Sequence, residues 1–142
     1  MKKLALDLND VTKTFQKDDG YITAVDKVSL QVEEGEMVTF LGPSGCGKTT
    51  TLRMVAGFEL PTSGSITIRG SDMTNTPVNK RKIGFVFQNY ALFPHMSVYN
   101  NVAYGLKARG EKDKDIRDKV RDALVMVGLV DTENRYPSQL SG

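Results

Sequence analysis

The chain has 142 residues, 39% of them hydrophobic and 25% charged, which is typical of one folded domain with a modest core. Its 19 basic and 17 acidic residues nearly cancel, so no strong field of one sign attracts nucleic acid or anionic lipid, and we expect no nucleic-acid partner. A single cysteine, Cys46, excludes an internal disulfide and favours a reducing compartment. The early charges do not suit a signal peptide, and no apolar run reaches membrane-spanning length, so any membrane should lie beside the chain.

Three segments alternate apolar and polar side chains, which is typical of half-buried strands. Residues 4–8 and 28–32 are the first two, and the polar residues 17–20 between them predict a turn. Residues 64–70 contain the third, with Ile66 and Ile68 on one face. We therefore expect an antiparallel β portion at the start of the chain.

Two denser apolar runs, residues 37–41 and 83–87, lack this alternation. Such runs are typical of strands covered on both faces, as the strands of parallel sheets are. Residues 49–56 follow the first run and look helical, with Leu52, Val55 and Ala56 expected to share one apolar face and Gly57 placed to end the helix. This order predicts strand, loop and helix around residues 42–48.

Helical spacing prevails after about residue 97. Ser97 is a predicted N-cap for a helix whose residues Val98, Val102 and Leu106 share one face. A second helix should end at Gly128, and its apolar stripe comprises Ile116, Val120, Ala123, Leu124 and Val127.

Residues 42–49 read Gly-Pro-Ser-Gly-Cys-Gly-Lys-Thr and match the pattern G-x-x-x-x-G-K-[ST] without a mismatch. In such a loop, backbone N–H groups and the N-terminus of the following helix converge on phosphate. Lys48 would reach the outer phosphate oxygens of ATP, and the Thr49 hydroxyl would complete the coordination of Mg²⁺. A chance match in a glycine-rich turn is the alternative, which the predicted strand and helix on either side disfavour.

A phosphate loop alone does not distinguish kinases, small GTPases, helicases and transport ATPases. Residues 42–57 resemble the Walker A segment of ATP-binding cassette (ABC) proteins, residues 87–95 resemble the Q-loop of that family, and residues 136–142 resemble the approach to its signature motif. Phe15 matches the early aromatic residue on which adenine stacks in the family, with Tyr21 as a nearby alternative. The matches occur in family order and cover essentially the whole chain.

The resemblance implies a set of site residues. Lys48 and Gln88 would be catalytic, and Thr49 and Gln88 would hold Mg²⁺, although Gln88 could instead be an ordinary solvated loop residue. Ser141 and Gly142 would contact the ATP bound by a second copy of the chain. The full set expected to bind ATP is Phe15, Gly42, Pro43, Ser44, Gly45, Cys46, Gly47, Lys48, Thr49, Thr50, Gln88, Ser141 and Gly142.

Residues 87–98 are similar to the ATP-hydrolysing subunits of importers for polyamines, ferric iron, sulfate or maltose, with polyamine or ferric iron as the nearest cargoes. The resemblance implies an ATPase that works as a homodimer, peripheral on the cytoplasmic face of the membrane. The apolar residues around 90–98 would dock a permease subunit, and His95 would be a loop residue on that surface. The alternatives are a soluble cassette ATPase of DNA repair or translation, or a nucleotide module that only binds.

The chain reaches only the first part of the family's Leu-Ser-Gly-Gly-Gln, at Leu140, Ser141 and Gly142. By resemblance, the Walker B aspartate, the adjacent glutamate and the switch histidine lie beyond it, so we expect little or no turnover from this stretch. The expected fold class is α/β, truncated before the Walker B strand. It combines a P-loop NTPase core with an antiparallel β portion and Q-loop over residues 1–96, and a helical subdomain over residues 97–142.

Overall fold

The computed structural model describes residues 3–140, and the chain divides into two compact units, one up to Phe85 and one from Val86 onward. The division into a core over residues 1–96 and a helical subdomain over residues 97–142 follows the expected functions of the segments and stays a prediction.

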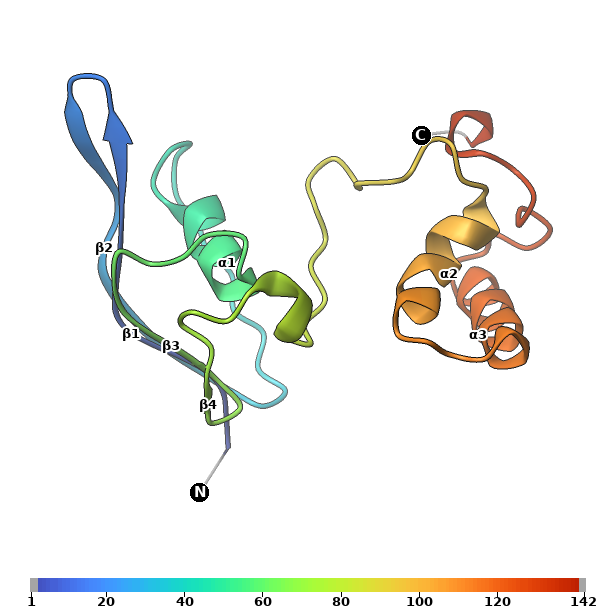
Figure 1. Cartoon of the computed structure of the whole chain (residues 1–142), viewed down its shortest axis with the longest axis horizontal. Coiled ribbons are helices and arrows are strands. Elements are labelled where there is room, and N and C mark those ends of the chain that lie inside the picture. The colour runs from blue at the N-terminus through green and yellow to red at the C-terminus, as the bar shows by residue number, and fades with distance from the viewer. Residues whose placement is uncertain (1–2, 141–142) are drawn as a thin grey trace. The chain divides into compact units, whose positions relative to one another are not determined.

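The first unit is built around a long antiparallel β-hairpin (Figure 1). Strand β1 (Leu4–Lys17) pairs with β2 (Gly20–Glu33), and the register runs from Leu4 opposite Glu33 to Lys17 opposite Gly20. The two predicted strands and the turn between them are confirmed. Both strands extend beyond the residues in which apolar and polar side chains alternate.

Strand β3 (Ser63–Ile68) pairs with the other edge of β1, and the short β4 (Ser71–Asp72) pairs with β3, so the sheet has the order β2-β1-β3-β4. All its pairings are antiparallel. The strand predicted within residues 64–70 is confirmed, and the fold of the described residues is a mixed α/β arrangement with an antiparallel sheet. A short 3₁₀ turn, η1 (Val78–Lys80), follows the sheet.

Helix α1 (Lys48–Ala56) packs against this sheet and begins one residue before the predicted start. Met54 is 1% exposed and belongs to a core shared with the sheet residues Leu8, Val11, Val25 and Ile66. The buried residues of the helix are Thr51, Met54 and Ala56, and Val55 packs against the same core, whereas Leu52 is 46% exposed. The expectation that Leu52 faces the core was therefore wrong.

The predicted buried strands at residues 37–41 and 83–87 are absent from the part of the chain that the structure describes. Met37 is 91% exposed and Leu41 is 89% exposed, and the segment carries no strand hydrogen bonds. An apolar run becomes a strand only where neighbouring strands bond its backbone, and no strand within residues 3–140 pairs with either run. The parallel part of the expected P-loop core is therefore not formed by these residues.

The second unit is built on α2 (Val98–Ala108) and α3 (Asp113–Met126), followed by the 3₁₀ turn η2 (Pro137–Gln139). Ser97 caps α2 as predicted, since its hydroxyl accepts a hydrogen bond from the Asn100 amide at 3.3 Å. The two helices share a core that comprises Val98, Ala103, Ile116, Val120 and Leu124.

Two predicted core positions of this unit were wrong. Val102 is 38% exposed while the neighbouring Ala103 is fully buried, and Val127 is 65% exposed because it lies beyond the last residue of α3. No helix within residues 3–140 combines the length and apolar character needed to span a bilayer.

Candidate functional site

The loop of residues 42–47 leads directly into the N-terminus of α1. The first intrahelical donor is Thr51, whose amide bonds the Gly47 carbonyl at 2.9 Å. The amides of Lys48, Thr49 and Thr50 precede it and donate to no acceptor within residues 3–140. The first turn carries no acidic side chain and no side-chain cap, so the positive end of the helix is available to an anion.

The side chain of Lys48 folds back over the loop that precedes it. Its Nζ donates to the carbonyl oxygens of Gly42 and Pro43, at 2.7 Å each, and lies 3.4 Å from the Sγ of Cys46. These contacts fix one positive charge within the curve of the loop, next to the donors at the start of α1. Cationic and amide donors are thereby gathered at one place.

Gly47 holds the loop against the hairpin. It is the N-cap of α1 and has φ of 92°, a left-handed conformation that favours glycine. A Cβ at this position would lie 2.5 Å from the carbonyl oxygen of Ala24 and 3.2 Å from a methyl of Val25, both on β2. The third glycine of the motif is thus required by the close approach of a neighbouring strand as well as by the turn.

Phe15 lies on β1 of the same hairpin, opposite Ile22, and is half-buried. The ammonium of Lys13 sits 4.9 Å from the centre of its ring, within the range of a cation–π contact. Lys13 is held there by the carboxylate of Glu59 at 3.2 Å and the carbonyl of Leu60 at 2.8 Å. Tyr21, the alternative aromatic residue, is 76% exposed near the hairpin turn. The assignment of the adenine platform stays a prediction.

The other predicted site residues belong to the second unit. Gln88 is exposed, in a turn that continues through Tyr90 and Ala91, both with positive φ. Its role beside the metal stays a prediction, and Ser141 and Gly142 lie outside the described residues. Within residues 3–140 no cluster of three or more His, Cys, Asp or Glu side chains could hold a metal ion.

Arg81 is a buried charged residue that the sequence did not single out. It is 2% exposed, and its guanidinium donates to carbonyl oxygens of α1 and of the loop after β4. Burial lowers its pKa by desolvation. It stands between Lys80 and Lys82, both exposed, so the run resembles an ordinary solvated basic stretch.

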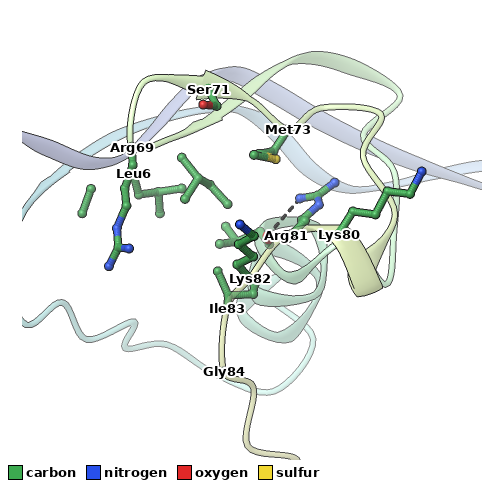
Figure 2. Close-up of a pocket in the computed structure, with 12 residues that line it drawn as sticks. Leu6, Arg69, Ser71, Met73, Lys80, Arg81, Lys82, Ile83 and Gly84 are labelled. Atoms are coloured by element: carbon green, nitrogen blue, oxygen red, sulfur yellow. Dashed lines mark hydrogen bonds between the residues drawn. The ribbon is translucent and has the colours of Figure 1, made fainter. Parts of the chain in front are cut away.

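A cavity of about 580 Å³ lies beside Arg81, at the opposite end of α1 from the phosphate loop (Figure 2). Leu6, Val55 and Ile68 line it together with residues 80–84, and none of residues 42–49 does. The cavity and the phosphate loop are therefore separate features of the first unit.

The comparison with protein families decides which phosphate-loop protein this is: the family model described as ABC transporter matches residues 25–142. The chain belongs to the ABC transporter family. The resemblance inferred from the motifs is thereby confirmed.

Curated relatives that this chain resembles include import ATP-binding proteins. The chain is 53% identical over its whole length to the spermidine/putrescine import ATP-binding protein PotA of Marinobacter nauticus. It is 54% identical, over 91% of its length, to the Fe(3+) ions import ATP-binding protein FbpC of Rhizobium etli. It spans 37% of the length of each.

Two solved structures of the ATP-binding cassette MJ0796 resemble this fold. One is a dimer in a post-hydrolysis state bound to ADP and Pi, with a TM-score of 0.85 and 34% identity over 96% of this chain and 63% of that one. The other is also dimeric, with a TM-score of 0.86 and 33% identity over the same shares.

Proposed function

We propose that residues 1–142 form the ATP-binding part of the energy-coupling subunit of an ABC importer. One observation carries the proposal: the Lys48 ammonium and the unbonded amides that open α1 lie at one end of a helix anchored on the hairpin. A fixed set of donors at a helix N-terminus suits a multiply charged phosphate ligand.

ATP would bind through its phosphates. The amides of residues 48–50 would donate to phosphate oxygens, and the Lys48 ammonium would exchange its contacts with Gly42 and Pro43 for contacts with the outer phosphates. Thr49 is exposed at the first turn, where its hydroxyl is free to join a Mg²⁺ shell otherwise made of phosphate and water oxygens. Mg²⁺ prefers such oxygen ligands, so the residues present fit Mg-ATP, and the ion would neutralise phosphate charge.

The remaining site residues complete this proposal. Phe15 would stack against adenine, Gln88 would contact the metal and the attacking water, and Ser141 and Gly142 would reach the ATP of a second copy in a homodimer. Support comes from the motif order in the sequence and from the dimeric state of the two MJ0796 structures. ATP would close two such domains together, and hydrolysis would reopen them.

Residues 1–142 alone should hydrolyse ATP slowly or not at all. The stretch carries the phosphate loop and the Q-loop motif, but neither of the acidic residues that the resemblance places after the signature motif. Phosphoryl transfer depends on such metal-holding and water-orienting groups. Binding and turnover should therefore separate when this stretch is assayed by itself.

The cargo would be a polyamine or ferric iron, and the subunit would work at the cytoplasmic face of the membrane. The names of PotA and FbpC support this class of cargo. The choice between the two stays open, because the phosphate loop acts on ATP and carries no contact with the cargo.

A permease subunit would dock on the second unit near residues 90–98. Tyr90 is 80% exposed and Leu92 is 52% exposed, although apolar side chains of this size are usually covered. Phe93, in contrast, packs its ring 4.7 Å from that of Tyr104 and both accepts from and donates to Asn101, so it supports the unit itself. Tyr90 and Leu92 are therefore the residues to change.

Replacing Tyr90 and Leu92 with aspartate should abolish capture of the cognate membrane subunit in a pull-down, because two charges would face an apolar partner. Met126→Asp is the matched control: Met126 is 85% exposed on α3, outside residues 90–98, and does not line the apolar hollow that Leu92 shares with α3. Undiminished capture by the double variant would exclude the docking role. Absence of any membrane partner for the unmodified protein would favour a soluble cassette ATPase or a module that only binds nucleotide.

A further inference from the structure

The segment of residues 81–85 is fastened to the end of α1 at two points. Arg81 donates from Nη1 to the carbonyl oxygens of Met54 at 2.7 Å and Val55 at 2.9 Å. Four residues later, the ring of Phe85 meets that of Phe58 edge-on, with 5.2 Å between the ring centres. The segment that leads along the chain to Gln88 is thus attached to the C-terminal end of the phosphate-loop helix.

Arg81 joins the end of α1 to the loop after β4 through one guanidinium. Besides the two helix carbonyls, its Nε donates to the Thr76 carbonyl at 2.7 Å and its Nη2 to the Thr74 carbonyl at 3.3 Å. The planar five-donor fork of arginine can serve several carbonyls at once, and a cation at a helix C-terminus also complements the helix dipole. Figure 2 shows Arg81 beside α1, with a dashed line for the hydrogen bond between its guanidinium and the helix.

The fit around this guanidinium is tight. Gly57 ends α1 with φ of 85°, and a Cβ there would lie 2.5 Å from Nε of Arg81. The absence of a side chain at Gly57 therefore lets the guanidinium approach the helix end. Arg81 is 2% exposed, so these hydrogen bonds are shielded from water.

The helix carries this constraint to the phosphate loop. Nine residues span about 13 Å at the helical rise, so a tilt of about 5° at the C-terminal end would move the N-terminal amides by about 1 Å. Hydrogen bonds to phosphate weaken steeply with such displacements. Gly47 fixes the other end of α1 against β2, and both ends are needed to hold the helix at one angle.

We propose that Arg81 is a positioning residue for nucleotide binding: it holds the C-terminal end of the phosphate-loop helix, and with it the amides that receive the phosphates. Arg81 would touch no nucleotide itself and would act through α1. The inference rests on the proposed function, because it requires that the loop before α1 binds ATP.

The test compares Mg-ATP affinity and amide hydrogen exchange in the complete protein. Arg81→Gln keeps a polar side chain but loses the charge and the fork. Arg69→Gln is the matched control, because Arg69 is exposed on the rim of the same cavity (Figure 2). Titrations are made well below the unfolding temperature of each variant, so that the dissociation constant reports folded protein.

Arg81→Gln should weaken Mg-ATP binding about tenfold and speed amide exchange in residues 51–56, while the amides of β1 keep their protection. Arg81→Lys should keep more of the affinity than Arg81→Gln, because it keeps the positive charge. The affinity should still fall below that of the unmodified protein, because an ammonium can donate to fewer of the four carbonyls than a guanidinium. If Arg81→Gln does not fold, Arg81→Lys carries the test with a loss of about threefold. Arg69→Gln should bind like the unmodified protein.

Unchanged affinity in the Arg81 variants would overturn the inference and leave Arg81 with a purely structural role, even if their unfolding temperature falls. A failure of the proposed function looks different: the unmodified protein would not bind Mg-ATP, or Lys48→Ala would bind as well as the unmodified protein. The inference would then fall together with the function.

Discussion

Replacing Lys48 with alanine should weaken Mg-ATP binding about a hundredfold or more, which corresponds to about 2.7 kcal/mol. The ammonium is the one side-chain cation that contacts the loop carbonyls within residues 3–140, and hydrogen bonds from it to phosphate would be charge-assisted. Isothermal titration of the complete protein measures the effect. The free energy of unfolding without nucleotide should change little, because the side-chain hydrogen bonds of Lys48 within residues 3–140 all go to its own loop.

Lys114→Ala is the control for this change, since Lys114 is an exposed lysine on α3 in the second unit. Lys114→Ala also removes one positive charge, but far along the sequence from the phosphate loop, so the Mg-ATP affinity should not change. Equal affinities for Lys48→Ala and the unmodified protein would mean that the loop does not bind the phosphates.

Gly47→Ala should damage both the fold of the loop and nucleotide binding. A left-handed φ costs a residue with a Cβ about 1 kcal/mol, and the collision with the Ala24 carbonyl should add about 1–3 kcal/mol, since backbone atoms give way poorly. The amides of α1 would shift with the displaced N-cap, so we expect Mg-ATP affinity to fall at least about tenfold. Denaturant unfolding and titration together measure the two effects.

Gly35→Ala isolates the conformational part of this loss. Gly35 also has a positive φ, 83°, but nothing lies within 4 Å of the Cβ position, so its replacement should cost only about 1 kcal/mol. Similar losses for Gly47→Ala and Gly35→Ala would show that the contact with β2 does not constrain the loop.

The elements that the sequence predicted well are those whose signals are local. The alternation in residues 4–8 and 28–32 specifies the hairpin, and Ser97 marks the start of α2. The runs at residues 37–41 and 83–87 failed because a buried strand depends on neighbouring strands, and none within residues 3–140 bonds to them. Apolar content alone predicts burial but supplies no hydrogen-bonding partner.

The site shows the same contrast. The spacing of Gly42, Gly47 and Lys48 predicted a phosphate loop opening a helix, and the structure places α1 there. The sequence gives no sign that Gly47 lies against Ala24, because that contact depends on how the hairpin crosses the loop. Arg81 escaped notice for a related reason: an arginine between two lysines resembles a solvated charge run until its carbonyl partners are known.

Residues 42–50 should receive the phosphates of ATP. Titrating Mg-ATP into isotopically labelled residues 1–142, while following the amide resonances and the release of phosphate, tests it most directly. We expect saturable shifts concentrated in the amides of residues 42–50, much smaller shifts with adenosine, and negligible phosphate release. Mg-ATP that leaves these amides unchanged, or shifts only amides elsewhere, would contradict it.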